Sequence, residues 1–190
     1  MMPQIQNPQQ HETLRTIQEV IKTRFGQPFQ VLNILAHSDS VLQSYIAFEM
    51  QFESVLANDE QLKELIYFKV AMILDCPFCL DIGQWLALKS GLPKSKLAAI
   101  NQPDNSIFSE RERMALMLAT KLCLNDCDIS DADRQILLSQ FSEQEVVELM
   151  AIIAWENFRS RLNKGLGILS QHFYDDDISA TANPKPEDRV

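Results

Sequence analysis

Cys76 and Cys79 stand three positions apart in the stretch DCPFCLDIGQW, in a chain that has four cysteines. Pro77 suits the first turn of a helix, because its missing N–H would have no intrahelical partner there. Cys76 would then lie at a helix N-terminus, where unpaired N–H groups and the helix dipole favour a thiolate. The spacing also lets one sulfur resolve an intermediate formed on the other. The pattern favours redox chemistry, with structural burial and a metal site as alternatives.

The metal alternative needs further ligands, and Cys123 and Cys127 are the obvious ones. A four-thiolate zinc site is usually built from two close cysteine pairs. Cys123 falls within an apolar stretch that reads as a helix, and Cys127 falls in the loop NDCD, so their spacing is looser than in such a site. We expect Cys123 to fill the core, Cys127 to be a loop thiol, and no metal to be bound.

Composition indicates the fold class. The chain has 190 residues, 46% of them hydrophobic, which is enough to bury one substantial core. It contains only five glycines, and long stretches pass without glycine or proline, which favours helices over a sheet with tight turns. We expect an all-α domain over residues 1–174, followed by a polar, acidic, proline-bearing tail over residues 175–190.

The net charge of −9 disfavours nucleic acid and anionic membrane surfaces as partners, because either would repel the average surface. A small molecule or another protein is the expected partner. The first residues are polar, and no apolar run approaches the length of about 18 residues needed for a transmembrane helix. We therefore expect a cytoplasmic protein, where four cysteines are not a disulfide framework.

Apolar periodicity and capping residues predict about seven to eight helices. Gly26 ends the first, and Asp59 caps the third. Ser109 and Ser142 each stand three residues before a glutamate, which is the pattern of a capping box. The expected helices cover residues 12–25, 39–58, 60–74, 77–90 and 94–100, a segment from 110 through 123, and residues 131–139 and 143–166.

Three runs then carry a resemblance: LKELIYFKVAMILDCPFCLDIGQWLALKSGL, SERERMALMLATKLC and FSEQEVVELMAIIAWENFRSRLNKGLGI. In this order they resemble the carboxymuconolactone decarboxylase superfamily, in the branch related to alkyl hydroperoxidase D, over roughly residues 32–168. The resemblance implies an all-helical fold with the CxxC pair at the start of a buried helix. It also implies homo-oligomers, thiol peroxidase or disulfide reductase activity, and no prosthetic group.

The resemblance also implies roles for individual residues. The motif of that branch has a glutamate twelve positions before the first cysteine and a histidine four positions after the second. Glu64, Cys76 and Cys79 match this motif, so Cys79 would attack a peroxide, Cys76 would resolve the sulfenic acid, and Glu64 would relay protons. Since a glutamate near lysines is often solvated, the relay requires Glu64 to be at least partly buried. The histidine position is Gly83, which has no side chain.

Three residues could bear on this departure. Asp81 lies two positions from Cys79, on nearly the opposite helix face, and is either a first-turn acid or part of the site. His37, in the run LAHSDS, could reach the site, although a loop or capping role is more typical. Gly83 either opens room for a substrate beside Cys79 or permits a close helix crossing.

The expected function is a thiol-dependent peroxidase or disulfide oxidoreductase that uses an external thiol reductant on a hydroperoxide or a disulfide. The absence of the histidine keeps a second class open, a catalytically weak redox sensor or binding protein. Lactone decarboxylase chemistry is a third class, which the CxxC pair argues against because those enzymes do not rely on a cysteine pair.

Overall fold

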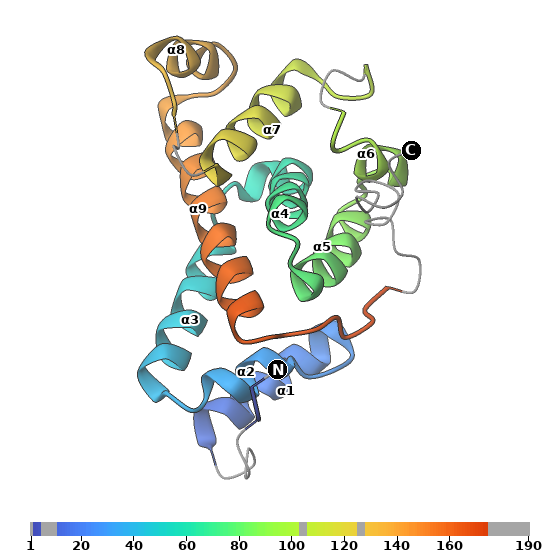
Figure 1. Ribbon diagram of the computed structural model, residues 1–190, viewed down its shortest axis with the longest axis vertical. Coiled ribbons are helices and arrows are strands. Elements are labelled where there is room, and N and C mark those ends of the chain that lie inside the picture. Colours follow the sequence, from blue (N-terminus) through green and yellow to red (C-terminus); the bar gives the residue numbers. More distant parts are fainter. Residues whose placement is uncertain (1, 5–10, 103–105, 125–127, 175–190) are drawn as a thin grey trace.

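The computed structural model describes residues 2–4, 11–102, 106–124 and 128–174. All regular secondary structure in these ranges is helical, which confirms the expected all-α class (Figure 1). The elements are α1 (Glu12–Phe25), α2 (Gln30–Leu35), α3 (Asp39–Phe52), the 3-10 helix η2 (Ala57–Asp59), α4 (Glu60–Leu74), α5 (Pro77–Lys89), α6 (Lys94–Ala98), α7 (Glu110–Cys123), α8 (Asp131–Gln140) and α9 (Glu143–Gly165). The expected tail over residues 175–190 lies outside the described residues.

Helix α4 forms the centre of the molecule and is enclosed by α5, α7 and α9 (Figure 1). Residues Leu62 to Met72 are all buried, and Lys63 and Lys69 are among them. The lysines tolerate burial because their ammonium groups reach the ends of other elements: Lys63 Nζ lies 2.7 Å from the carbonyl oxygen of Phe52, and Lys69 Nζ lies 3.3 Å from that of Ile100. The helix that carries Glu64 is thus a core helix rather than an amphipathic surface helix.

Two features near the start of the chain differ from the sequence-based expectation. Helix α2 was not predicted, because its six residues form less than two turns and its N-cap, Phe29, makes no side-chain cap hydrogen bond. Helix α3 ends at Phe52 rather than near residue 58. Lys63 also donates to the carbonyl of Glu53, so its ammonium caps the carbonyl end of α3, and Leu56 then turns the chain with a φ of +51°.

The predicted helix starts after Ser109 and Ser142 are confirmed, and both are complete capping boxes. A third box, formed by Ser130 and Asp133, begins α8. In each box the serine hydroxyl accepts the N–H three residues on while the acid accepts the serine's own N–H. These boxes fix where α7, α8 and α9 begin, and so set which residues of α9 face α4 and α5.

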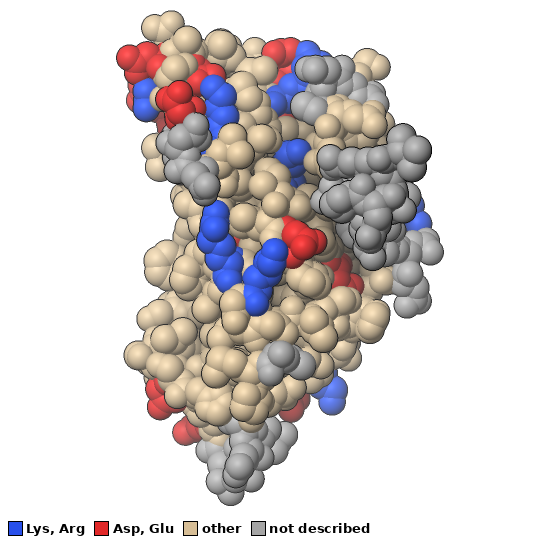
Figure 2. Space-filling model, in the orientation of Figure 1, with Lys and Arg blue, Asp and Glu red and all other residues tan. Residues whose placement is uncertain are grey.

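The surface in Figure 2 mixes acidic and basic side chains at the end of the molecule that holds α8, while uncharged residues dominate the lower half of the same face. None of the helices within the described ranges combines the length and the hydropathy that a bilayer-spanning segment needs.

Candidate redox site

The turn between α4 and α5 sets the position of both site cysteines. Asp75 adopts a left-handed conformation, with a φ of +52°, and ends α4. Cys76 is extended and is the N-cap of α5, and Pro77 is the first helical residue. The Cys79 N–H donates to Cys76 Sγ over 3.3 Å, so the sulfur of Cys76 caps the N-terminus of α5. The predicted placement of Cys76 at a helix N-terminus is confirmed.

Cys76 and Cys79 are joined as a disulfide, and their Cα atoms are 5.3 Å apart. Disulfides normally join Cα atoms about 4.4–6.8 Å apart, so this pair can open and close without a backbone rearrangement. Cys76 has no exposed surface, whereas Cys79 is 7% exposed. Of the two sulfur-bearing residues, Cys79 is therefore the one that a small molecule can approach.

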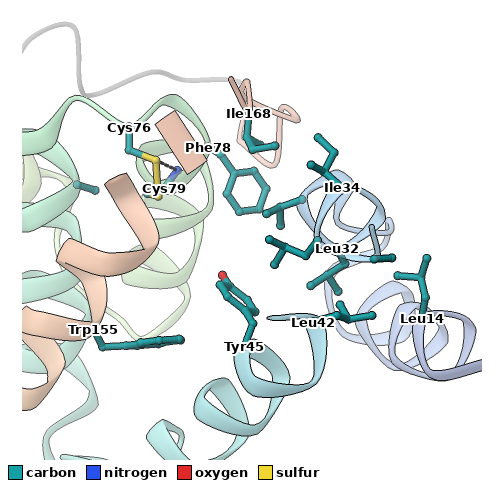
Figure 3. Packing of buried hydrophobic residues seen from close by; sticks show 14 residues of the cluster. Leu14, Leu32, Ile34, Leu42, Tyr45, Cys76, Phe78, Cys79, Trp155 and Ile168 are labelled. Atoms are coloured by element: carbon teal, nitrogen blue, oxygen red, sulfur yellow. Dashed lines mark hydrogen bonds between the residues drawn. A yellow bond between two sulfur atoms is a disulfide. The ribbon is translucent and has the colours of Figure 1, made fainter. Parts of the chain in front are cut away.

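The disulfide lies at one edge of an apolar cluster (Figure 3). In this view Phe78 and Ile168 lie between the disulfide and α2, while Tyr45 of α3 and Trp155 of α9 lie below the disulfide. Polar contacts in such surroundings gain strength because little water competes for them. Any polar group that reaches the sulfurs therefore matters for their chemistry.

Asn163 of α9 is such a group, and sequence reasoning missed it. Its Nδ2 lies 3.4 Å from Cys79 Sγ, and the residue is only 1% exposed. The signal was present in the pattern of α9, whose buried stripe begins with apolar residues at 149, 152 and 153 and continues with Glu156, Ser160 and Asn163. Polar residues that continue an apolar stripe lie in the core, where they need partners.

Glu64 is buried, at 8% exposure, so the alternative of a solvated side chain does not hold. Burial raises its pKa to about 7, and the nearby positive charges of Arg159 and Lys63 offset only part of this effect. Its Oε2 makes no hydrogen bond to any of the described residues. The structure thus places a carboxyl group in the core that changes protonation near neutral pH, while its part in a proton relay stays a prediction.

A cluster of charges on α3, α4 and α9 surrounds this carboxyl group. The Arg159 guanidinium donates to both carboxylate oxygens of Glu49 at 3.0 Å and also to Glu156, and it lies over the ring of Tyr67. Glu156 accepts a further hydrogen bond of 2.7 Å from the Ser160 hydroxyl, and burial raises its pKa. Arg159 is the positive charge common to these acids.

Gly83 lies where α5 crosses α4 closely. A Cβ atom at this position would lie 3.7 Å from Cδ2 of Phe68, which is ordinary van der Waals contact. Gly83 is buried and Phe68 flanks the position, which disfavours an opening for substrate, and the crossing of α4 and α5 leaves room for a Cβ atom.

We expect the Gly83→Ala substitution to raise the free energy of unfolding by up to about 1 kcal/mol, because alanine favours a helix interior by that amount and fits without displacing Phe68. Urea denaturation measures the change. Gly91→Ala is the control of opposite sign, since Gly91 has a φ of +92° and alanine there is strained. A destabilised Gly83→Ala variant would show that a Cβ atom does not fit beside Phe68 and that the crossing of α4 and α5 requires glycine.

Asp81 binds the segment that follows α9. Its Oδ2 accepts from Ser170 Oγ and from the N–H of Gln171, both at 2.8 Å, and its Oδ1 accepts from the N–H of Phe173 at 2.9 Å and from that of Tyr174 at 3.3 Å. These four bonds give Asp81 a structural role that accounts for both of its oxygens, and they fasten the segment to the helix that carries Cys79.

His37 is exposed, and its Nε2 lies 2.9 Å from the carbonyl oxygen of Pro3. The structure therefore shows it in contact with the N-terminal segment. The suggested part of His37 in the site stays a prediction.

The metal alternative can be compared with the described part of the chain, where no three His, Cys, Asp or Glu side chains are grouped to hold a metal ion. Cys123 is buried, as expected for a core residue, and its sulfur accepts from Asn157 Nδ2 at 3.3 Å. Cys127 lies outside the described residues.

An apolar groove with a volume of about 640 Å³ runs between α3 and α9. Tyr45 and Trp155, which also pack into the cluster around the disulfide, form part of its lining. Phe48 and Phe158 stack on either face of Trp155 and are 51% and 48% exposed. Exposed apolar faces of this kind are typical of surfaces that contact another chain, although the expected homo-oligomer stays a prediction.

Comparison with known proteins finds a relative in sequence and several solved structures of similar fold. No family model matches it. It is 30% identical over 114 residues to the uncharacterized protein YnjA of Escherichia coli strain K12, a match that covers 60% of this chain and 63% of that relative, which is less than two thirds of its length.

Solved structures match over more of the chain. The debrominase Bmp8 superposes with a TM-score of 0.78 and 17% identity, over 94% of each chain. An alkylhydroperoxidase AhpD core protein of Ralstonia eutropha JMP134, described as peroxidase-related, superposes with a TM-score of 0.71 and 18% identity, over 92% of each chain. At these identities the likeness establishes the fold. The fold expected from the resemblance is thereby confirmed, and the chain has the same all-helical fold as the alkylhydroperoxidase AhpD core structure.

Proposed function

We propose that this protein is a thiol-dependent peroxidase that reduces organic hydroperoxides through the Cys76–Cys79 pair. The observation that carries the proposal is the disulfide itself, which closes at the N-terminus of α5 with a Cα separation of 5.3 Å. A pair that closes with so short a span can cycle between dithiol and disulfide within one subunit.

The proposed cycle begins at Cys79, the more exposed of the two residues. Its thiolate attacks the terminal oxygen of the hydroperoxide, the O–O bond breaks, and the alkoxide leaves as an alcohol after it takes up a proton. Cys79 has lost two electrons and is a sulfenic acid. The Cys76 thiol then attacks the sulfenic sulfur, water leaves, and the disulfide forms. An external dithiol reduces this disulfide and becomes a disulfide in turn.

Glu64 is the proposed proton carrier in this cycle. An acid with a pKa of about 7 is present in both protonation states at neutral pH, which is the condition under which one group can accept the thiol proton and return it to the alkoxide. Since Glu64 Oε2 has no partner among the described residues, it is also available to bind water that connects it to the site.

The surroundings of the disulfide support an apolar substituent on the hydroperoxide. Phe78, Tyr45 and Trp155 belong to the same buried apolar cluster as the pair, and the last two also line the apolar groove. A related structure of the debrominase contains 2,3,4-tribromopyrrole, so this fold can accommodate a small ring. Cumene hydroperoxide, which carries an aromatic ring, is accordingly the first substrate to try.

Consumption of cumene hydroperoxide by the purified chain, with dithiothreitol as reductant, tests the proposal against the Cys79→Ser and Cys76→Ser variants. We expect Cys79→Ser to abolish consumption, because serine at that position cannot form a sulfenic acid. When the dithiothreitol is removed after the reduction step, Cys76→Ser should reduce one equivalent of hydroperoxide and then accumulate the Cys79 sulfenic acid, which dimedone traps. Consumption by the unsubstituted chain no faster than by Cys79→Ser would refute the peroxidase and favour a redox sensor, since Gly83 offers no proton-transferring side chain.

A further inference from the structure

Asn163 is a buried amide side chain that the structure places against the sulfur of Cys79. It comes from α9, 84 positions along the chain from Cys79, and its Nδ2 lies 3.4 Å from Cys79 Sγ. The residue one turn beyond Cys79 on its own helix is Gly83, which has no side chain to offer. The contact to the reacting sulfur is therefore supplied across a helix interface.

The carbonyl oxygen of the same amide, Oδ1, is buried and has no hydrogen-bond partner among the described residues. A buried carbonyl oxygen without a donor is costly, so this atom is expected to have a partner beyond the described residues, and a bound substrate is one such partner. In this residue, which is 1% exposed, Nδ2 donates to the sulfur and Oδ1 is a neighbouring acceptor without a donor among the described residues.

We propose that Asn163 binds the hydroperoxide, with Oδ1 accepting its O–H while Nδ2 donates to the Cys79 sulfur. A hydroperoxide has one O–H group, and the oxygen that bears it is the one the thiolate attacks. One amide that holds both atoms places the terminal oxygen beside the sulfur. The inference rests on the proposed peroxidase function and adds the residue that positions the substrate.

The chemistry of the step is unchanged and balanced. Cys79 as a thiolate and R–O–O–H give Cys79–S–O–H and R–O⁻, and the alkoxide takes up the proton that the thiol released. Asn163 gains and loses no proton. Its hydrogen bond to the sulfur stabilises the thiolate. Its hydrogen bond to the hydroperoxide holds the terminal oxygen close to the sulfur, which raises the rate of attack.

The test separates these two contacts with two reagents. N-ethylmaleimide alkylates the thiolate and has no hydrogen-bond donor, so its rate reports the sulfur alone. Cumene hydroperoxide needs the Oδ1 acceptor as well. Both rates are measured at Cys79 by peptide-resolved mass spectrometry, in chains that carry Cys76→Ser so that Cys79 has no partner thiol. Serine is a favoured N-cap, so this background keeps the start of α5.

We expect Asn163→Leu to lower the ratio of the hydroperoxide rate to the maleimide rate by about tenfold to a hundredfold, the factor expected for one hydrogen bond in a buried site. Asn163→Asp keeps an oxygen acceptor and loses the donor, so its maleimide rate should fall while the ratio falls much less. Asn157→Leu is the matched control: its amide contacts the sulfur of Cys123 at 3.3 Å from the same helix, and it should leave the ratio at Cys79 unchanged.

Equal ratios in Asn163→Leu and the Cys76→Ser background would overturn the inference and leave the peroxidase proposal intact. A Cys79 that reacts with the maleimide but not with the hydroperoxide in any of these chains would overturn both. If Asn163→Leu does not fold, as judged by circular dichroism, the Asn163→Asp chain decides: a ratio tenfold or more below that of the Cys76→Ser background contradicts the assignment of Oδ1.

Discussion

The Arg159→Met variant is expected to unfold with a free energy about 3 kcal/mol below that of the unsubstituted chain at pH 8. Removing one partner of a buried ion pair typically costs about 3–5 kcal/mol, because the remaining charge is left without compensation. The Arg159 and Glu156 side chains are 19% and 3% exposed, so the carboxylate left behind is the more deeply buried of the two. The residual exposure of Arg159 places the estimate at the lower end.

The loss should be smaller at pH 5. The charge of Arg159 lowers the pKa values of Glu156 and Glu64, which burial raises, so its removal moves both pKa values further up. At pH 5 the two acids then take up protons and no longer leave unpaired charges in the core. A carboxyl group with a raised pKa stabilises the folded state at low pH, and this stabilisation is lost as the pH rises through that pKa.

Urea denaturation at both pH values measures the effect, with Arg134→Met as the matched control. Arg134 pairs with Asp131 at 2.7 Å on the surface of α8, where the two side chains are 55% and 96% exposed. Exposed pairs contribute about 0–1 kcal/mol, so the same substitution there should change little. Equal losses in the two variants would show that the buried acids do not depend on Arg159.

The Glu64→Gln substitution should change how stability depends on pH. A pKa of about 7 in the folded state, against 4.5 for an ordinary glutamate, means that the folded chain holds this proton between those values and the unfolded chain does not. The contribution of Glu64 to the free energy of unfolding therefore falls by about 2.5 kcal/mol from pH 5 to pH 8. Glutamine has no proton to lose, so the variant should gain about this much relative to the unsubstituted chain over the same interval.

The measurement is the difference in free energy of unfolding between variant and unsubstituted chain at pH 5 and at pH 8. Glu19→Gln, at an exposed position of α1, is the control, because a side chain that keeps its water contributes little to this difference. A Glu64→Gln difference that stays constant with pH would mean that Glu64 does not hold its proton near neutrality, and the proton carrier would have to be sought elsewhere.

The sequence predicted most helix starts well, because capping residues are local signals. Ser109, Ser142 and the Cys76–Pro77 step all began helices where expected. The end of α3 was not predictable in this way, since Lys63, a residue of the next long helix, caps it. The burial of Lys63 and Lys69 was not predictable for the same reason: lysines are usually solvated, and only folding brings to them the carbonyl groups that their ammonium groups contact.

The site shows the same division. The cysteine pair and the burial of Glu64 followed from a motif that lies within one stretch of chain. Asn163 reaches Cys79 across 84 positions of sequence, and that contact depends on how α9 packs against α5. Asp81 was considered for the site, yet its oxygens bind a segment some ninety positions later in the chain. Local sequence patterns thus could not predict which distant residues these polar side chains contact.

The stripe formed by Glu156, Ser160 and Asn163 restricts how the gene can change. These residues share one face because they are spaced by four and three positions on an uninterrupted helix. One inserted or deleted residue between Glu156 and Asn163 would rotate everything beyond it by about 100°, and would turn the amide away from the sulfur while the acid stayed in place. Between Glu156 and Asn163 the number of residues is therefore fixed, so substitutions can be tolerated in this segment while insertions and deletions cannot.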